Sequence, residues 1–262
     1  MNIKQKDNIT KWILLLLSSI TIIMLGWIIG YILFKGFRHI DLTKLIEPII
    51  ATLYMVAISL LISAPIGIGA AVYLNEYAKD GYFVRFIRFA TETLAAVPSI
   101  LFGLFGMMFF LTQCKLGFSI LAGSLTVSLM ILPTIVKTTE EALKTVPVAL
   151  REGSLALGAS QFATIMKVVL PSALPGILTG IVLATGRIVG ETAAIYLTAG
   201  TMLNLPETPM DSGRTLAVHL YLLAKEGISF DEAYGTAVVL LVTILLLNLL
   251  TYMIGHKLRK VK

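Results

Sequence analysis

Apolar residues in this chain cluster in long runs that contain no charged side chain. About 20 apolar residues in helical conformation cross the hydrocarbon core of a bilayer, so each run of this length predicts a membrane-spanning helix. The charge-free runs cover residues 12–34, 48–75, 93–114, 116–136 and 233–256. A sixth run, 172–200, is interrupted only by Arg187 and Glu191. The predicted spans therefore lie at about 12–34, 48–74, 93–113, 117–137, 172–200 and 232–256.

The segments between the spans are short. Residues 75–91 mix charged and aromatic side chains, which is typical of either an interfacial helix or a solvated connector. Residues 201–230 are expected to fold back on the membrane or to meet an external partner. Ser229 followed by Glu232 is the pattern of a capping box, which predicts the start of the last helix. With no separate soluble segment, residues 1–262 are predicted to form one all-α membrane domain.

Composition agrees with this membrane assignment. Charged residues make up 14% of the chain, apolar residues 57%, and the mean hydropathy is +0.89, whereas soluble domains are about one quarter charged. The first apolar run is too long for a signal-peptide core and has no small-residue cleavage site after it. We therefore expect it to remain as an uncleaved membrane anchor.

Positive charges predict the orientation, because cytoplasmic loops of membrane proteins carry an excess of lysine and arginine. With a cytoplasmic N-terminus, 14 of the 21 Lys and Arg residues fall in cytoplasmic segments and 6 fall outside, the remaining one being Arg187. Both termini are therefore expected in the cytoplasm, together with residues 140–171. The net charge of +6 is then a signal of topology, and we expect no nucleic-acid partner.

The cytoplasmic loop at about 140–171 has the features of a docking element. Its sequence at 151–158 is Arg-Glu-Gly-Ser-Leu-Ala-Leu-Gly, and Leu170-Pro171 follows. Gly158 is expected in a left-handed turn and Ser160 as the cap of the next helix. The small residues Gly153 and Ser154 would let a partner approach the helix closely. An ordinary connector between two spans is the alternative.

Arg187 and Glu191 are placed four residues apart within the predicted fifth span, so a continuous helix would present both on one face. Charges at such a depth cost several kcal/mol unless they are paired or hydrated. Arginine offers a planar set of donors for an oxyanion, and glutamate could accept a hydrogen bond from a protonated phosphate oxygen while repelling sulfate. The alternative is an ion pair that holds the helices together. Thr185 and Thr192 are possible hydroxyl donors, although such threonines often bond to their own backbone.

Other chemistry has little support in the sequence. Cys114 is the single cysteine, and His39, His219 and His256 are scattered, so neither a disulfide nor a metal site is expected. No phosphate-binding Gly-x-x-x-x-Gly-Lys-Ser/Thr loop occurs. If ATP drives this protein, we expect ATP and Mg²⁺ to be bound by a partner chain, and no cofactor to be bound by this one.

Several stretches resemble a known family. Residues 65–77, 92–106 and 186–193 are similar to the permease subunits of the bacterial phosphate-specific ABC importer, and the loop at 152–171 resembles the EAA loop of ABC importer permeases. There Glu152, Gly153 and Ser154 occupy the Glu-Ala-Ala positions, while Gly158, Leu170 and Pro171 keep the register. The Glu-Thr-Ala-Ala sequence at 191–194 and the Leu-Thr-Ala-Gly sequence at 197–200 resemble the A-type permease, in which proline is usual at the position of Ala194.

The resemblance implies the six-helix fold of type I (MetI-like) ABC importer permeases, with cytoplasmic coupling helices, in a bacterial cell membrane. It also implies a C-type permease partner, two cytoplasmic ATPase subunits and an extracellular or periplasmic phosphate-binding protein. By position, Arg187 and Glu191 would line the substrate path. A permease for sulfate or molybdate is the nearest alternative, and a channel or a membrane-embedded enzyme is a more distant one.

Overall fold

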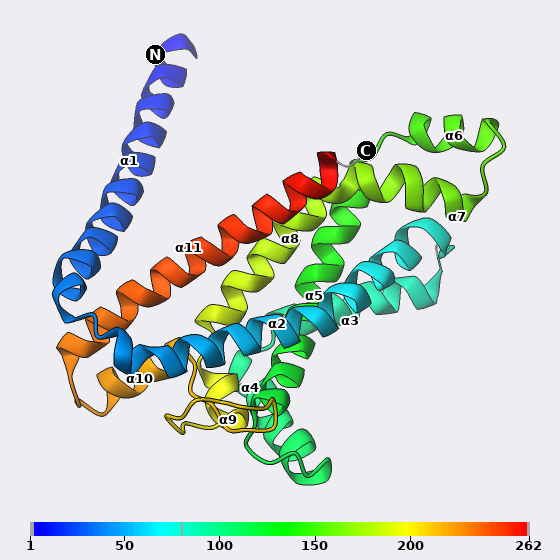
Figure 1. Ribbon diagram of the computed structural model, residues 1–262. Helices are drawn as coiled ribbons and strands as arrows, with labels where there is room; N and C mark the ends of the chain where they lie inside the picture. The colour runs from blue at the N-terminus through cyan, green and yellow to red at the C-terminus, as the bar shows by residue number, and fades with distance from the viewer. Residues whose placement is uncertain (1–2, 80, 261–262) are drawn as a thin grey trace.

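The computed structural model describes residues 3–79 and 81–260, and every regular element in these residues is helical (Figure 1). Short 3₁₀ (η1) and π-helical (η2, η3, η4) segments join or extend the α-helices. In chain order the elements are α1 (Ile3–Gly36), η1 (Phe37–His39), α2 (Leu42–Val72), η2 (Tyr73–Tyr77), α3 (Tyr82–Ala96), α4 (Ser99–Gly106), η3 (Met107–Gln113), α5 (Ile120–Lys144), α6 (Val148–Ala156), α7 (Gln161–Thr164), η4 (Ile165–Val169), α8 (Leu170–Gly190), α9 (Ala193–Thr198), α10 (Leu216–Lys225) and α11 (Phe230–Lys260).

Within the described residues, five helices are long and apolar enough to cross a membrane, and a bent pair supplies a sixth crossing if it counts as one. The pair consists of α3 and the α4–η3 helix, which meet at 99°. Pro98 explains the bend, because proline restricts the residue before it to extended conformations, and Val97 has φ −67° and ψ 131°. The predicted third span at 93–113 therefore differs from the structure: Thr93 belongs to α3, and the straight segment begins at Ser99.

Other helices extend beyond the apolar runs that predicted them. Helix α2 begins six residues before Pro48, and Asp41 caps it by accepting a hydrogen bond from the Thr43 amide at 3.1 Å. Helix α5 continues to Lys144, about two turns past residue 137. The first turns of α2 and the last turns of α5 are polar, so hydropathy alone misses them and predicts both helices too short.

Helix α5 is the centre of the bundle, with 67% of its most apolar stretch buried. Its side chains Met130 and Ile135 pack in one core with Met55 of α2, Ile188 of α8 and Ile195 of α9. Helix α8 approaches α5 closely along a line of small residues. A Cβ atom at Gly180 would overlap Thr138, and one at Gly176 would overlap Ala142. The two helices are therefore antiparallel neighbours in close backbone contact.

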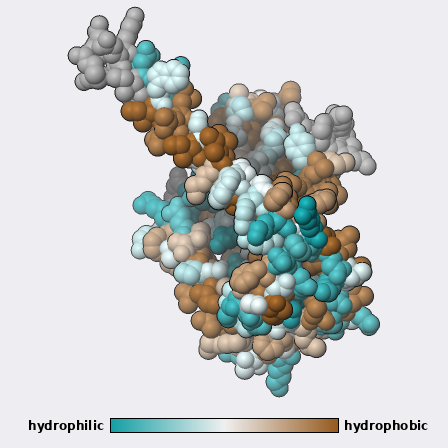
Figure 2. Space-filling model, turned by 90° about the vertical axis from the view of Figure 1, so that its left-hand side faces the viewer, coloured by the Kyte–Doolittle hydropathy of each residue, from teal (hydrophilic) through white to brown (hydrophobic). Residues whose placement is uncertain are grey.

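Among the described residues, helix α1 touches α11 only near its C-terminal end, where the Tyr31 and Tyr234 rings lie 5.9 Å apart, and it then projects from the bundle. None of its most apolar stretch is buried, and Trp12, Trp27 and Phe34 are 71%, 70% and 79% exposed. Figure 2 shows it as a projecting apolar rod. An apolar surface of this length is not stable in water, so lipid or another protein must cover it.

The start of α1 and the end of α11 lie at the same end of the molecule as α6 and α7 (Figure 1). The 201–215 loop and α10 lie at the other end. Helix α10 folds back on the bundle, and the Leu216 amide at its start donates to Thr52 Oγ1 of α2 at 3.0 Å. This segment therefore packs on the chain's own bundle, and the expectation that it meets the membrane or an external partner stays a prediction. At the start of α11, Ser229 Oγ accepts from the Glu232 amide at 3.2 Å, as the capping-box pattern predicts.

Candidate translocation and coupling sites

The predicted fifth span is not one helix. Helix α8 ends at Gly190, and Glu191 has an extended backbone with φ −71° and ψ 130°. The Glu191 side chain turns toward the following segment, where its Oε1 accepts a hydrogen bond from the Ala194 amide at 3.1 Å. The expectation that Arg187 and Glu191 share one helix face is therefore wrong. The i, i+4 spacing assumed a continuous helix through Glu191. Instead the helix ends, and the Glu191 carboxylate accepts the hydrogen bond of the Ala194 amide in the first turn of α9.

Arg187 lies in the last turn of α8 and reaches across to α5. Its Nη1 donates to Thr134 Oγ1 at 3.4 Å, and the side chain is only partly buried. Glu191 is 9% exposed, so the two charges differ in access. Arg187 retains further donors on its planar guanidinium group, and these are available to an oxyanion.

The two threonines beside the pair have different environments. Thr185 is 1% exposed, and its hydroxyl donates to the Ile181 carbonyl at 2.8 Å, so it belongs to the helix core. Thr192 Oγ1 contacts the Gly190 carbonyl at 3.4 Å at the break between α8 and α9. The hydroxyl that the structure brings to Arg187 is instead that of Thr134. Thr134 is 53 residues away in sequence, and no local pattern identified it.

Helices α6 and α7 form the expected helical hairpin. Gly158 has φ +84°, the left-handed conformation that glycine adopts at little cost. Ser160 Oγ accepts from the Ala163 amide at 3.2 Å and caps α7. Ser154 of α6 and Thr164 of α7 are hydrogen-bonded through their hydroxyls at 2.9 Å. Both local predictions for this turn, the left-handed glycine and the serine cap, are confirmed.

The outer surface of the hairpin is exposed and partly apolar. Glu152 and Gly153 are exposed, and a Cβ atom at Gly153 would meet nothing within 4 Å. Leu157 is 91% exposed and Phe162 is 65% exposed. Large exposed apolar side chains in a polar segment between two membrane helices are typical of an interaction surface.

Leu170 and Pro171 lie inside a continuous helix rather than at the end of a loop. The chain runs from α7 through the π-helical η4 into α8 without a break. Pro171 lacks an amide hydrogen and cannot make a regular α-helical bond. The π-helical η4 directly precedes α8, in which Pro171 is the second residue.

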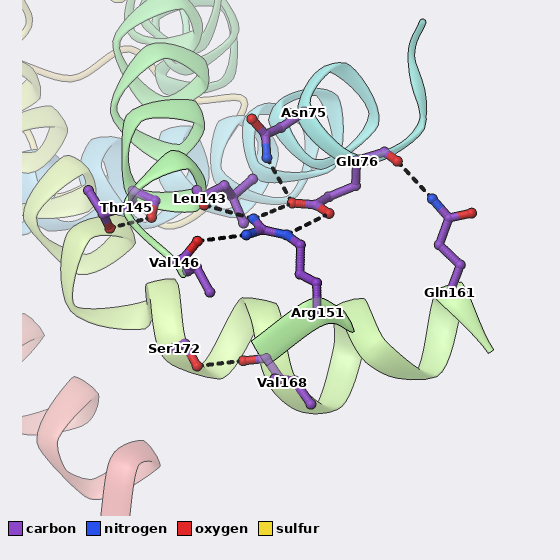
Figure 3. A network of polar contacts seen from close by, with 10 residues as sticks. Asn75, Glu76, Leu143, Thr145, Val146, Arg151, Gln161, Val168 and Ser172 are labelled. Atoms are coloured by element: carbon purple, nitrogen blue, oxygen red, sulfur yellow. Dashed lines mark hydrogen bonds and ion pairs between the residues drawn. The ribbon is translucent and has the colours of Figure 1, made fainter. Parts of the chain in front are cut away.

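A network of charge-assisted bonds ties the hairpin to the bundle (Figure 3). Arg151 of α6 binds both carboxylate oxygens of Glu76 in η2, through Nη2 at 2.8 Å and Nε at 3.3 Å. The same guanidinium donates to the carbonyls of Leu143 at 2.9 Å and Val146 at 2.7 Å. Gln161 of α7 donates to the Glu76 carbonyl at 2.8 Å. One arginine therefore joins α6 to the ends of both α2 and α5.

The pair is poorly hydrated, with side-chain exposures of 19% for Arg151 and 9% for Glu76. Loss of one partner from such a pair leaves an uncompensated charge. The sequence placed Arg151 in the loop motif and Glu76 in a connector, but 75 residues separate them. The one indication of a role in the sequence is that each residue lies in a polar segment between two apolar runs.

Most of the chain is similar to known membrane transport proteins. Residues 63–260 match the family described as "Binding-protein-dependent transport system inner membrane component". A probable ABC transporter permease, YqgI of Bacillus subtilis, is 33% identical over 99% of this chain and 98% of its own length. The phosphate transport system permease protein PstA of Mycobacterium leprae is 30% identical over 93% of this chain and 86% of its own length.

Solved structures share the fold. A chain in the crystal structure of a bacterial alginate ABC transporter, in complex with an alginate-bound periplasmic protein, superimposes with a TM-score of 0.71 at 19% identity, covering 97% of this chain and 98% of that chain. A chain of the inward-facing MetNI methionine ABC transporter gives a TM-score of 0.64 at 20% identity over 83% of this chain and 95% of that chain. The six-helix MetI-like fold is thereby confirmed. This chain belongs to the family of binding-protein-dependent ABC transporter inner-membrane permeases and, within it, to the PstA-like permeases.

Proposed function

We propose that this permease is the A-type subunit of an ATP-driven phosphate importer in a bacterial cell membrane, where it forms half of the translocation path. Relatives named as phosphate transport permeases, of which the chain covers most of the length, support phosphate as the substrate. The observation that carries the proposal is Arg187, a cation in an otherwise apolar span, held at the α5–α8 contact with donors to spare.

Glu191 has a double role in this proposal. Its Oε1 accepts the hydrogen bond from the Ala194 amide at the break between α8 and α9. Its second carboxylate oxygen can accept a hydrogen bond from a protonated phosphate oxygen near Arg187. Thr192 at the break is a further candidate for the path. A fully ionised sulfate offers no proton to such a carboxylate, so the same arrangement favours phosphate over sulfate or molybdate.

ATP hydrolysis is assigned to two partner ATPase subunits, which also bind ATP and Mg²⁺. Their docking surface is the α6–α7 hairpin with Glu152, Gly153, Ser154 and Gly158 at its turn. Leu170 and Pro171 continue the hairpin into α8, so a displacement of the hairpin moves the helix that carries Arg187. Arg151 transmits the same displacement to α2 and α5 through its bonds to Glu76 and two carbonyls.

The remaining partners follow from the architecture of such importers. A C-type permease would complete the path, and an external phosphate-binding protein would deliver substrate at the 201–215 end. In this arrangement both chain termini and the hairpin face the cytoplasm, in accord with the distribution of lysine and arginine. A related alginate transporter has been crystallised with its periplasmic binding protein, which supports a partner of that kind.

The test is uptake of labelled phosphate, with labelled sulfate as the competitor substrate, in cells that depend on this permease. We expect Arg187→Gln to reduce phosphate uptake at least tenfold at matched membrane abundance, the cost of one charge-assisted hydrogen bond or more. Normal uptake in Arg187→Gln would remove Arg187 from the path. Uptake of sulfate rather than phosphate by the wild type would overturn the substrate assignment.

A further inference from the structure

A polar strip runs along the last three turns of α5. Its residues are Thr134, Lys137, Glu141 and Lys144, whose spacing of three and four places them on one helix face. Lys137, Glu141 and Lys144 are exposed. The neighbouring faces of α5 are covered, on one side by α8 at Thr138 and Ala142.

Helix α3 covers the other side, where Arg88 Nη2 contacts Glu140 Oε1 at 2.8 Å. The strip therefore faces outward between α3 and α8. Lys137, Glu141 and Lys144 follow the charge-free run of α5, which ends at residue 136. Water, or the partner half of an aqueous path, must lie against their face of the helix, because a charge in hydrocarbon costs several kcal/mol.

A cleft of about 200 Å³ opens at the charged part of this strip, where Lys137, Glu141 and Lys144 line it. It lies between α3, η2 and α5, and its walls carry three cations and three carboxylates. The lining residues are Leu74, Arg88, Thr91, Glu92, Val136, Lys137, Glu140, Glu141 and Lys144.

Two of the cations in the cleft are engaged with the same carboxylate. Arg88 and Lys144 both contact Glu140 Oε1, at 2.8 Å and 2.9 Å. Among the residues that the structure describes, no ion pair involves Lys137. Lys137 is thus the cation of the cleft that has its ammonium group available for a ligand.

Lys137 also lies about one turn along α5 from the residue that contacts the arginine of the proposed path. Thr134, which accepts the bond from Arg187, precedes it by three residues, a rise of about 4.5 Å along the helix axis. We propose that Lys137 forms a second oxyanion station, about one turn closer to the α6–α7 end than Arg187, and that the cleft is the release side of the path. This inference rests on the proposed function, which it extends by one named residue.

The charge balance of the cleft suits release rather than storage. Three carboxylates offset the three cations, so an anion is attracted to Lys137 without being trapped, as conduction through successive sites requires. Glu141 and Glu92 lie in the same cleft and can accept a hydrogen bond from a protonated phosphate oxygen. The shared chemistry is a phosphate group, which either free phosphate or the headgroup of an anionic lipid could supply.

The first test is transport in the assembled importer. We expect Lys137→Gln to lower phosphate uptake about tenfold, in line with the loss of one charge-assisted hydrogen bond, and Lys137→Arg to retain most of it. Lys11→Gln is the matched control, since it removes the same charge from an exposed position on α1 and should leave uptake unchanged. Normal uptake in Lys137→Gln alongside loss in Arg187→Gln would overturn the second station and leave the proposed function standing.

The second test is accessibility, which does not depend on transport. In a Cys114→Ser background, Lys137→Cys should react with a membrane-impermeant thiol reagent added from the α6–α7 side of reconstituted vesicles. Leu249→Cys on the exposed apolar side of α11 should not react. Because Lys137→Cys lacks the proposed ligand-binding lysine, protection is measured at Glu141→Cys, one turn from Lys137 in the same cleft, where free phosphate in zwitterionic vesicles should slow the reaction. An unreactive cysteine, or protection by anionic lipid but not by phosphate, would overturn the proposal.

Discussion

At the scale of single residues, the side chains that matter most here are charged groups in places where water is scarce. Arg151 neutralises Glu76 and at the same time satisfies two carbonyl groups at the end of α5. Arg187 has a much weaker anchor, one contact of 3.4 Å to Thr134. Arg151, with four hydrogen bonds, is a structural link, whereas an arginine with most of its donors free is suited to a ligand. The two arginines therefore differ in their bonding more than in their sequence context.

Removal of the Glu76 carboxylate tests the structural link. We expect Glu76→Gln to lower the free energy of unfolding by about 2 kcal/mol, less than the 3–5 kcal/mol typical of a fully buried pair, because Arg151 keeps two carbonyl partners. Thermal unfolding of the detergent-solubilised transporter measures this change. Glu152→Gln removes an exposed carboxylate from α6 and should change stability by less than about 0.5 kcal/mol. Equal destabilisation by both variants would contradict a special role for the pair.

At the scale of elements, breaks in helices place the functional groups. The turn at Gly158 folds α6 against α7, and the turn at Glu191 separates α8 from α9. The first break has a clear local signature, since Gly158 is followed by a capping serine. The second does not, because the residues around Glu191 are compatible with a continuous helix. The helix breaks at Glu191, where the carboxylate accepts a hydrogen bond from an amide of the next helix.

Substitutions at Gly158 test the hairpin as a coupling element. A Cβ atom there would clash with nothing within 4 Å, so the cost is the left-handed backbone, about 1–2 kcal/mol for an ordinary residue. We expect Gly158→Lys to reach the membrane at normal abundance but to uncouple ATP hydrolysis from phosphate uptake. Gly158→Asn should retain most activity, because asparagine tolerates this conformation. Full uptake by Gly158→Lys would remove the docking argument.

At the scale of the whole molecule, an even number of crossings places the start of α1, the end of α11 and the hairpin at the same end of the molecule (Figure 1). The bent α3–α4 pair counts as one crossing in this arrangement. Helix α5 fills the centre, whereas α1 lies on the outside with its apolar residues uncovered. The position of α1 indicates a lipid or partner surface, and the polar strip of α5 indicates an aqueous one.

The orientation of the bundle is tested by a reporter that is active only in the cytoplasm. Fused after Lys262, it should be active, and fused within the 201–215 loop it should be inactive. The reason is the excess of lysine and arginine at the α6–α7 end, which sets topology during insertion. The reverse pattern of activity, with both fusions produced at equal levels, would invert the assignment of the two sides.

The sequence by itself determined the features that depend on neighbouring residues. Runs of apolar residues predicted the membrane helices, and Gly158 and Ser160 predicted a turn and a cap, because hydropathy and capping act over a few residues. The tertiary structure alone decided which distant groups meet. Thr134 and Arg187, and Glu76 and Arg151, are 53 and 75 residues apart, and helix packing brings them together. Packing also decided that α8 ends before Glu191 and that the face of α5 with Lys137 stays uncovered, since neither follows from periodicity along one chain segment.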